Sequence, residues 1–275
     1  MRSGVLCTAS DSEADAIWPA LDATHVFDSY DDLQRFRADG AWKVQFTERG
    51  EAVVLERWRS HLDVLAMLGV WCSRRRVPEL VQQVRRIASA RGYGRLLSPM
   101  VDTALAASYE RAGLAVHTRI VTLRRDRRGW NSGEPTMAEG MHLRRARKDD
   151  LPGLVQLDSE CFDDFWRYDG ERLARYLAKD RMVVAESSHE VIGYTLATTV
   201  RGTGTIGRLA VSPSARLRGV GETLLIDALG YLFRAGAEAV SLCTQEGNLA
   251  SRALYRKVGL MELDSRLVLL SGPTG

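Results

Sequence analysis

A strand, a glycine-containing turn and a helix follow one another near residue 215, and together they suit the binding of a phosphate group. Residues 209–211 form an apolar run typical of a buried strand, and Ser212-Pro213 directly after it marks a turn. Gly219 and Gly221 end the turn, and residues 222–234 have the periodicity of an amphipathic helix. This order brings unpaired backbone N–H groups and the positive end of a helix dipole to one place. Because glycine has no side chain, a phosphate can approach the amides closely.

Composition limits the classes of protein that the chain can represent. Its 275 residues are enough for two domains with separate cores. The 38 basic and 35 acidic residues give a net charge of +3, and so nearly balanced a charge does not indicate a nucleic-acid partner. The basic runs 74–76 and 124–128 are therefore interpreted as solvated faces. No apolar run approaches the roughly 20 residues of a membrane helix, and the first residues lack a signal-peptide pattern. We therefore expect a cytoplasmic protein with no membrane partner.

Four cysteines are spread along the chain, at positions 7, 72, 161 and 243. They form no Cys-x-x-Cys pair, and no histidine lies at metal-ligand spacing from them. The sequence thus predicts free thiols in a reducing compartment and no metal site. Cys161 and Cys243 could suggest a covalent acyl-enzyme, but a cysteine without a partner histidine is typical of a small buried apolar residue.

Hydrophobic periodicity predicts the same succession of elements twice. The first half is expected to contain a strand at 4–9, helices at 10–24 and 29–37, a hairpin at 41–57, a strand at 62–72, a helix at 78–90, a strand at 95–98, a helix at 102–111 and a strand at 114–125. The second is expected to contain a strand at 141–145, helices at 147–161 and 170–178, a hairpin at 182–200, a strand at 205–211, a helix at 219–234, a strand at 239–244, a helix at 248–257 and a strand at 260–270. Residues 126–140 lack periodicity and are expected to link domains of residues 1–125 and 141–275.

The repeat extends to individual residues, but the glycine turn is absent from the first half. Residues 108–114 align with residues 254–260 without a gap, and Asp102, which is expected to cap the helix that ends at 111, then aligns with Asn248. Where the second half has its glycine turn, residues 73–78 contain no glycine and end in a proline, which lacks an N–H group. The first half is therefore expected to keep the fold without the ligand.

These residues resemble the GCN5-related N-acetyltransferase (GNAT) superfamily in a tandem arrangement. The acyl-CoA signature of that family is Arg or Gln, two residues, Gly, one residue, and Gly or Ala, which Arg216, Gly219 and Gly221 match. A second signature, an Asn with a Tyr seven residues later and then Gly-Leu, matches Asn248 and Tyr255. The resemblance implies an α/β (α+β) fold with two tandem domains. Each domain would have a central mixed β-sheet, with parallel and antiparallel strands, flanked by helices. The resemblance covers residues 141–270 by motif and the first half by element order.

The resemblance also implies a cofactor site and a reaction. Acetyl-CoA would lie between the strands that end at Val211 and near Thr244, which separate in this fold. The implied cofactor contacts are Leu209, Ala210, Val211, Arg216, Leu217, Arg218, Gly219, Val220, Gly221, Glu222, Thr223, Asn248 and Ser251. The reaction would transfer an acetyl group to a primary amine in a ternary complex. Tyr255, with an ordinary pKa of about 10, would protonate the departing thiolate as general acid, although it could instead be a core aromatic.

The general base and the acceptor stay open. The two separating strands carry no carboxylate at 206–209 or 241–244, which leaves Glu160, Asp163, Asp164 and Glu246 as candidates acting through water. The aromatic segment 161–168 could form a wall of the acceptor pocket or pack onto the sheet. The acceptor would be a small amine metabolite or a peptide N-terminus, and the chain a monomer or homodimer. A non-catalytic acyl-CoA sensor or scaffold is the alternative.

Overall fold

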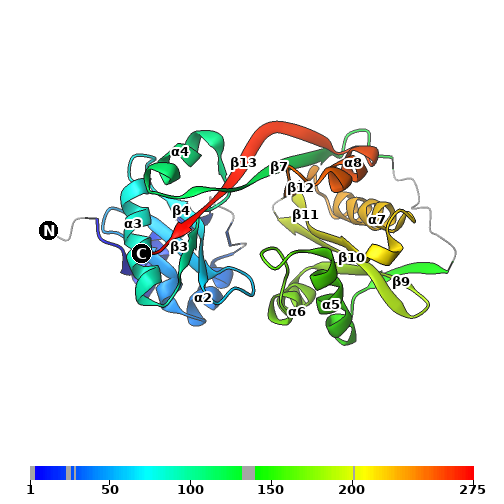
Figure 1. Cartoon of the computed structure of the whole chain (residues 1–275), viewed down its shortest axis with the longest axis horizontal. Helices are drawn as coiled ribbons and strands as arrows, with labels where there is room; N and C mark the ends of the chain where they lie inside the picture. Colours follow the sequence, from blue (N-terminus) through cyan, green and yellow to red (C-terminus); the bar gives the residue numbers. More distant parts are fainter. Residues whose placement is uncertain (1–3, 23–25, 28, 132–139, 201) are drawn as a thin grey trace. The chain divides into compact units, whose positions relative to one another are not determined.

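Helices and strands follow one another, twice over, in the order that the sequence periodicity predicts. The computed structural model describes residues 4–22, 26–27, 29–131, 140–200 and 202–275. Its contacts divide the chain into an N-terminal unit, Met1–Ile120 with Arg266–Gly275, and a C-terminal unit, Val121–Ser265 (Figure 1).

The described residues of the N-terminal unit form short strands and four α-helices. Its elements are β1 (Cys7–Thr8), α1 (Asp11–Asp22), α2 (Tyr30–Ala38), the 3-10 turn Ala41–Lys43, β2 (Val44–Phe46), β3 (Ala52–Arg57), β4 (Val64–Trp71), α3 (Val77–Ala90), β5 (Arg95–Leu97), β6 (Val101–Asp102) and α4 (Thr103–Arg111). The Asp102 side chain accepts the backbone N–H of Leu105 at 2.7 Å, so it caps α4 as expected. Strand β6 was not anticipated, because two residues carry no periodicity, and residues Ala41–Lys43, expected in the first strand of the hairpin, form a 3-10 turn instead.

The elements of the C-terminal unit match the second set of expected ranges within a few residues. They are β8 (Met141–Arg145), the 3-10 turn Lys148–Asp150, α5 (Leu151–Cys161), α6 (Gly170–Lys179), β9 (Arg181–Ser187), β10 (Glu190–Val200), β11 (Thr203–Val211), the 3-10 turn Pro213–Ala215, α7 (Val220–Arg234), β12 (Ala239–Gln245) and α8 (Leu249–Lys257).

Two strands change unit along their length, and this changes the domain boundaries. β7 (Ala115–Asp126) passes from the N-terminal to the C-terminal unit after Ile120, and β13 (Met261–Pro273) passes back after Ser265. The last residues of the chain pair antiparallel with β5, from Ser271 opposite Leu97 to Pro273 opposite Arg95. The contact division therefore differs from the linear domains 1–125 and 141–275 expected from the sequence. Residues 132–139 of the expected linker lie outside the described residues.

In the N-terminal unit the strand order is β1-β2-β3-β4-β5, and the end of β13 follows β5. Helix α3 packs its apolar face on this sheet, with Leu80 and Val84 almost fully buried among Leu55, Met67 and Leu96. Proline at the start of α3 is favourable because the first N–H groups of a helix have no internal partner anyway.

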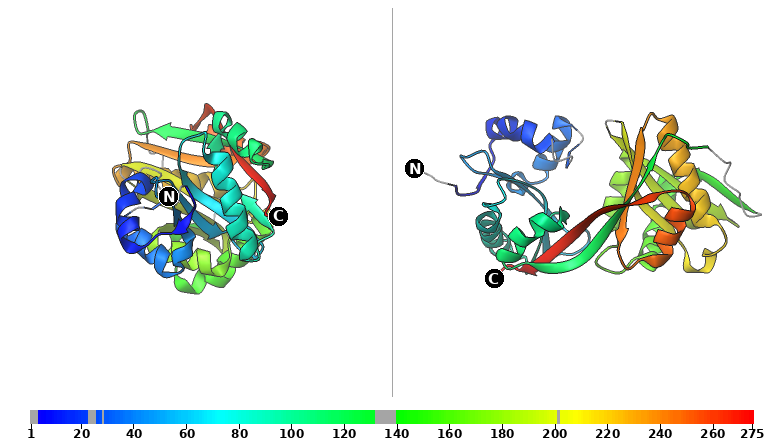
Figure 2. Two further views of the ribbon diagram at one scale, coloured as in Figure 1. Left: turned by 90° about the vertical axis from the view of Figure 1, so that its left-hand side faces the viewer. Right: turned by 90° about the horizontal axis from the view of Figure 1, so that it is seen from above.

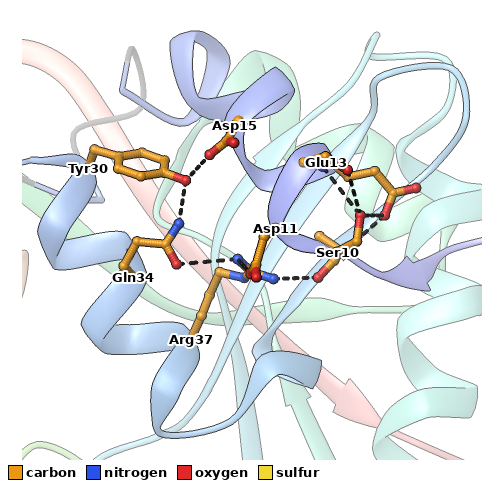
Figure 3. A network of polar contacts seen from close by, with 9 residues as sticks. Ser10, Asp11, Glu13, Asp15, Tyr30, Gln34 and Arg37 are labelled. Carbon is orange, nitrogen blue, oxygen red and sulfur yellow. Dashed lines mark hydrogen bonds and ion pairs between the residues drawn. The ribbon is translucent and has the colours of Figure 1, made fainter.

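A polar network joins α1 and α2 of the N-terminal unit (Figure 3). Arg37 on α2 is 6% exposed and donates to the carboxylate of Asp11 at 2.9 Å and to the carbonyl of Ala9 at 2.6 Å. The Tyr30 hydroxyl bonds the Asp15 carboxylate, which links the two helices a second time. The network ties both helices to the chain just after β1.

In the C-terminal unit the strand order is β7-β12-β11-β10-β9-β8. Helices α5 and α6 pack in one apolar cluster, with Leu154 and Leu173 against Tyr194 and Leu196 of the sheet. Helix α7 packs through Leu225 and its neighbours in separate clusters. Figure 2 shows helices on both faces of this sheet. The layers position two features for the site, namely the end of β11 and the beginning of α7.

Candidate functional site

The parallel strands β11 and β12 separate after three residue pairs. Thr203, Gly204 and Thr205 pair with the residues from Ala239 to Ser241, and among the described residues no further pairing joins the two strands. The remaining residues, 206–211 on β11 and 242–245 on β12, therefore leave backbone groups on facing edges without a partner strand. The separation that the family resemblance implied is thus present in the C-terminal unit.

A β-bulge at Gly207 lies where the two strands separate. Ala197 of β10 pairs with Ile206 and Leu196 pairs with Arg208, so Gly207 is an extra residue with no partner opposite. The extra residue reverses the alternation of side chains along β11. Ile206 packs with the α7 residues, whereas Arg208, two positions later, points to the face covered by α5. The bulge thus places a charged side chain on the α5 face.

The glycine turn leads into the N-terminus of α7, where no side chain caps the first amides of the helix. Gly219 is the N-cap in the left-handed region at φ 82°, a conformation that glycine adopts without strain. The N–H of Thr223 donates to the carbonyl of Gly219 at 3.0 Å, which forms the first turn of the helix. The N–H groups that precede that of Thr223 have no acceptor within the helix, as is general for the first amides of an α-helix. Leu217, also at positive φ, is fully exposed and does not cover them.

Gly221 has a different role from Gly219. A Cβ atom added at Gly219 would meet nothing within 4 Å, but one at Gly221 would lie 3.1 Å from the Leu254 side chain and 3.5 Å from that of Val211. Gly221 therefore allows α7 to begin close to the end of β11 and to α8. The first glycine shapes the turn, and the second permits close packing.

Asn248 and Tyr255 both lie on or next to α8. The Asn248 side chain accepts the N–H of Ser251 at 3.3 Å, which caps the helix, and donates to the hydroxyl of Thr244 at 3.2 Å. Tyr255 is 7% exposed in the apolar cluster with Leu242. Burial raises the pKa of Tyr255 to about 12, although a hydrogen bond with Ser251 opposes the increase. Its phenol is therefore protonated at neutral pH.

The carboxylates expected to assist an amine have local partners. Glu160 is exposed and accepts from the Gln156 side chain at 3.0 Å. Asp163 is exposed and accepts the N–H of Trp166 at 3.1 Å. Asp164 pairs with Arg167 at 2.7 Å. None of these three contacts leads to the separating strands.

A buried charged group that sequence reasoning missed lies beside the bulge. Asp158 on α5 is fully buried and accepts from Arg208 at two nitrogens, Nε at 2.8 Å and Nη2 at 2.6 Å. The hydroxyl of buried Tyr194 on β10 donates to the same carboxylate at 2.5 Å. The available signal was Asp158 following Leu154 and Leu157 on the apolar face of α5, since a carboxylate there requires a partner.

The protonation states of this group follow from burial and charge. Burial raises the pKa of Tyr194 well above its ordinary value, and the neighbouring Asp158 charge adds to the increase. Burial, the largest single influence, lowers the pKa of Arg208, but the hydrogen bonds to Asp158 and the neighbouring acidic groups together outweigh it, so the net pKa is raised. The three residues thus form an ion pair with a neutral phenol that donates to it.

The N-terminal unit lacks the features of the glycine turn. Its α3 has Arg76 as N-cap in right-handed conformation, followed by Val77 and Pro78. Arg76 is held by Glu51, at 2.9 Å from its Nε atom. A cavity of about 630 Å³ opens nearby, lined by Arg49, Gly50, Glu51, Val70, Trp71, Cys72 and Ser73. This cavity lies beside β3 and the end of β4, so it is not the counterpart of the gap between β11 and β12.

Comparison with known proteins agrees with this geometry. The acetyltransferase (GNAT) family model matches residues 151–260, which include the bulge, the glycine turn and α8. The C-terminal unit is a GNAT acetyltransferase domain. A mycothiol acetyltransferase of Amycolatopsis mediterranei (strain U-32) is 25% identical over 205 residues, or 62% of this chain and 67% of that protein. The family and the transferase activity inferred from the sequence are therefore confirmed.

Solved structures extend the likeness to the whole chain. A GCN5-related N-acetyltransferase from Sphaerobacter thermophilus has a TM-score of 0.72 at 18% identity and covers 98% of this chain and 95% of its own. A tandem GNAT protein from the clavulanic acid biosynthesis pathway has a TM-score of 0.70 at 16% identity, with 98% of both chains covered. At these identities the likeness concerns the fold, and it confirms the tandem arrangement of two GNAT folds.

The GNAT family implies acetyl-CoA as the acyl donor, and the residues present fit it. The start of α7, which has no side-chain cap, suits a diphosphate, and the gap between β11 and β12 leaves strand edges for an amide-containing arm. In the described part of the chain no group of three His, Cys, Asp or Glu side chains could hold a metal ion. No helix among the described residues has the length and apolar character to span a membrane.

Proposed function

We propose that the GNAT domain transfers an acetyl group from acetyl-CoA to a primary amine, either of a small metabolite or of a peptide N-terminus. The observation that carries the proposal is the uncovered N-terminus of α7 next to the gap between β11 and β12. A diphosphate on those amides directs the rest of the donor along the gap toward Gly207.

The residues of the domain have separate roles in this proposal. The residues from Arg216 to Thr223 hold the diphosphate, with the turn shaped by Gly219. The backbone of β11 from Leu209 to Val211 binds the pantetheine arm, and Asn248 and Ser251 border it. The donor supplies the acetyl thioester, and Tyr255 supplies a proton to the thiolate that leaves. Its raised pKa of about 12 keeps it protonated for this purpose.

The amine must lose a proton before it attacks, and Glu160 and Asp163 are the candidates for this role. Both are exposed and lie around the end of α5, so they would act through water.

The N-terminal unit keeps the fold and is proposed not to bind acetyl-CoA. At the start of its α3, Pro78 lacks an N–H group and the N-cap residue Arg76 is paired with Glu51, whereas α7 of the other unit begins at Gly219 without a side-chain cap.

Calorimetry with acetyl-CoA tests the binding part of the proposal. We expect one equivalent per chain, and we expect Gly219→Asp to abolish binding, because a carboxylate at the turn repels the diphosphate. A matched variant at the corresponding loop of the N-terminal unit, Ser73→Asp, is expected to bind normally. Two equivalents, or normal binding by Gly219→Asp, would contradict the assigned site.

Thiol release from acetyl-CoA tests the reaction, with glucosamine, spermidine and an alanine-initiated hexapeptide as acceptors. Release that depends on the amine supports the transferase. The alternative is a non-catalytic acyl-CoA sensor or scaffold, which is favoured by the absence of a carboxylate at 206–209 and 241–244 of the separating strands. Tight binding of acetyl-CoA without release on any of the amines would support that alternative.

A further inference from the structure

The buried Asp158–Arg208 pair is directly connected to the segment between α5 and α6. Residues 162–169 form this segment, which we call the α5–α6 loop. At its beginning, the N–H of Phe162 donates to the carbonyl of Asp158 at 3.0 Å. At its end, the N–H of Tyr168 donates to the Asp158 carboxylate at 2.7 Å. One residue of α5 therefore holds both ends of the loop.

Arg208 contacts the same two loop residues by their rings. Its guanidinium carbon lies 3.4 Å from the ring centre of Phe162 and 4.1 Å from that of Tyr168. The planar guanidinium suits such stacking, which an ammonium group cannot reproduce. The Arg208 side chain thus binds the Asp158 carboxylate by hydrogen bonds while its plane contacts both ends of the loop.

The bulge connects this arrangement to the strand proposed to bind the donor. Arg208 directly follows Gly207 and directly precedes Leu209, and it reaches the α5 face only because the bulge reverses the side-chain alternation. A second contact lies further along, where the Cys161 thiol donates to the carbonyl of Val211 at 3.2 Å. The beginning of the α5–α6 loop is therefore fixed to β11 at two levels.

Fold stability alone does not account for a buried ion pair here. Replacing such a pair with apolar residues of similar size is often neutral or stabilising, because desolvation of two charges offsets their attraction. What the pair supplies instead is a defined geometry, since the Asp158 carboxylate accepts hydrogen bonds from Tyr168, Tyr194 and Arg208 in three fixed directions.

We infer that Asp158, Tyr194 and Arg208 are positioning residues that hold the α5–α6 loop, which the family resemblance already makes the expected wall of the acceptor pocket, in a fixed position against β11. This inference rests on the proposed acetyl transfer. The three residues act through the loop and do not contact the reacting atoms, so their replacement is expected to impair acceptor binding and leave donor binding intact.

The test replaces the group with apolar residues in the full-length chain, as Asp158→Leu, Tyr194→Phe and Arg208→Met together. Hydrogen–deuterium exchange then reads the amides of Trp166 and Arg167, whose partners lie within the loop at Asp163. We expect their exchange to speed up about tenfold or more, since hydrogen bonds to charged groups carry that much weight. The KM for the best amine of the panel is expected to rise about tenfold by the same reasoning, with the Kd for acetyl-CoA changed less than twofold.

A matched control exists in the same unit. Arg181 binds Asp227 through two nitrogens, at 2.7 and 3.3 Å, and stacks on Tyr231 at 4.3 Å. Arg181→Met with Asp227→Leu removes a partly buried pair of the same kind and is expected to leave loop exchange unchanged. Should the triple variant fail to fold, Arg208→Lys keeps the charge but not the stacking, and it is expected to speed loop exchange.

The outcomes separate this inference from the proposed function. Unchanged loop exchange in a folded triple variant or in Arg208→Lys overturns the inference, whatever the activity. Faster loop exchange with an unchanged acceptor KM also overturns it, as does a Kd for acetyl-CoA that weakens in parallel with the acceptor KM. If the wild-type chain acetylates none of the amines, the proposed function fails, and with it the assignment of the loop as an acceptor wall, while the exchange data still decide whether the group positions the loop.

Discussion

Replacing Tyr255 with phenylalanine distinguishes a general acid from a core aromatic. The ring of Tyr255 packs in the apolar cluster with Leu242 and Leu260, and the substitution keeps that ring in place. Only the hydroxyl is lost, together with its hydrogen bond to Ser251. A neutral hydrogen bond of this kind contributes about 0.5–1.5 kcal/mol, so the variant is expected to fold with about that loss of stability.

The expected effect on catalysis is much larger than the effect on stability. A positioned general acid contributes about 10²- to 10⁴-fold to the rate, so kcat is expected to fall within that range with little change in the Kd for acetyl-CoA. Thiol release measures kcat, and urea denaturation measures the stability. A variant with unchanged kcat would show that Tyr255 serves packing alone.

The matched control is Tyr109→Phe, at the corresponding position of the sequence repeat. Tyr109 is 1% exposed in the core of the N-terminal unit, and burial raises its pKa above the ordinary value. Its substitution is expected to leave kcat unchanged. A fall in kcat equal to that of Tyr255→Phe would refute the reasoning, because burial of the ring and not proton transfer would then explain both.

The pH dependence supplies a second test of the same residue. An acid must be protonated to act, and a group of raised pKa loses its proton only as the pH rises through the raised value. Because burial raises the pKa of Tyr255 to about 12, it is protonated throughout the range in which the enzyme can be assayed. Deprotonation of Tyr255 is therefore expected to cause no decrease in kcat below about pH 10. The wild-type pH profile in this range is expected to show no decrease that disappears in Tyr255→Phe. Such a decrease would contradict the burial of the phenol.

Three further predictions concern the two units. Gly219→Ala is expected to destabilise the chain by about 1–2 kcal/mol in urea denaturation, because the left-handed conformation at φ 82° strains any residue with a Cβ atom; an unchanged midpoint would contradict the assigned backbone conformation. Hydrogen bonds from Arg76 hold the pKa of Glu51 below its ordinary 4.5, so the stabilisation is complete above that pH and is lost as the pH falls through the lowered value. The unfolding free energies of the wild type and Glu51→Gln are therefore expected to converge in acid, and a constant difference down to pH 3 would argue against the pair. Deletion of residues 266–275 removes the buried side chains of Val268, Leu269 and Leu270, whose burial stabilises the fold by about 5–9 kcal/mol in total. The deletion is expected to abolish the protection of β5 amides from hydrogen exchange, because the end of β13 pairs with β5. Retained protection would show that the N-terminal unit does not need this strand.

The local order of the chain was predictable from the sequence because it depends on neighbouring residues. Apolar periodicity gave the ranges of nearly all helices and strands, and the cap at Asp102 was identified from its position before an apolar run. The glycine turn was predictable for the same reason, since positive φ at Gly219 and an open helix N-terminus both follow from residue types next to each other in the chain. The family assignment rested on these local motifs.

Pairings between distant residues were decided only by the tertiary structure. The bulge at Gly207 depends on the register between β10 and β11, and a shift of one residue reverses which face a side chain occupies. No pattern along β11 shows that Arg208 turns toward Asp158, 50 positions earlier. The same holds for β13, whose last residues contribute to the N-terminal unit because the free edge of β5 accepts them. The sequence by itself determined which elements form and where an anion can bind, whereas the charged group beside the site and the exchange of strands between units arose from long-range packing.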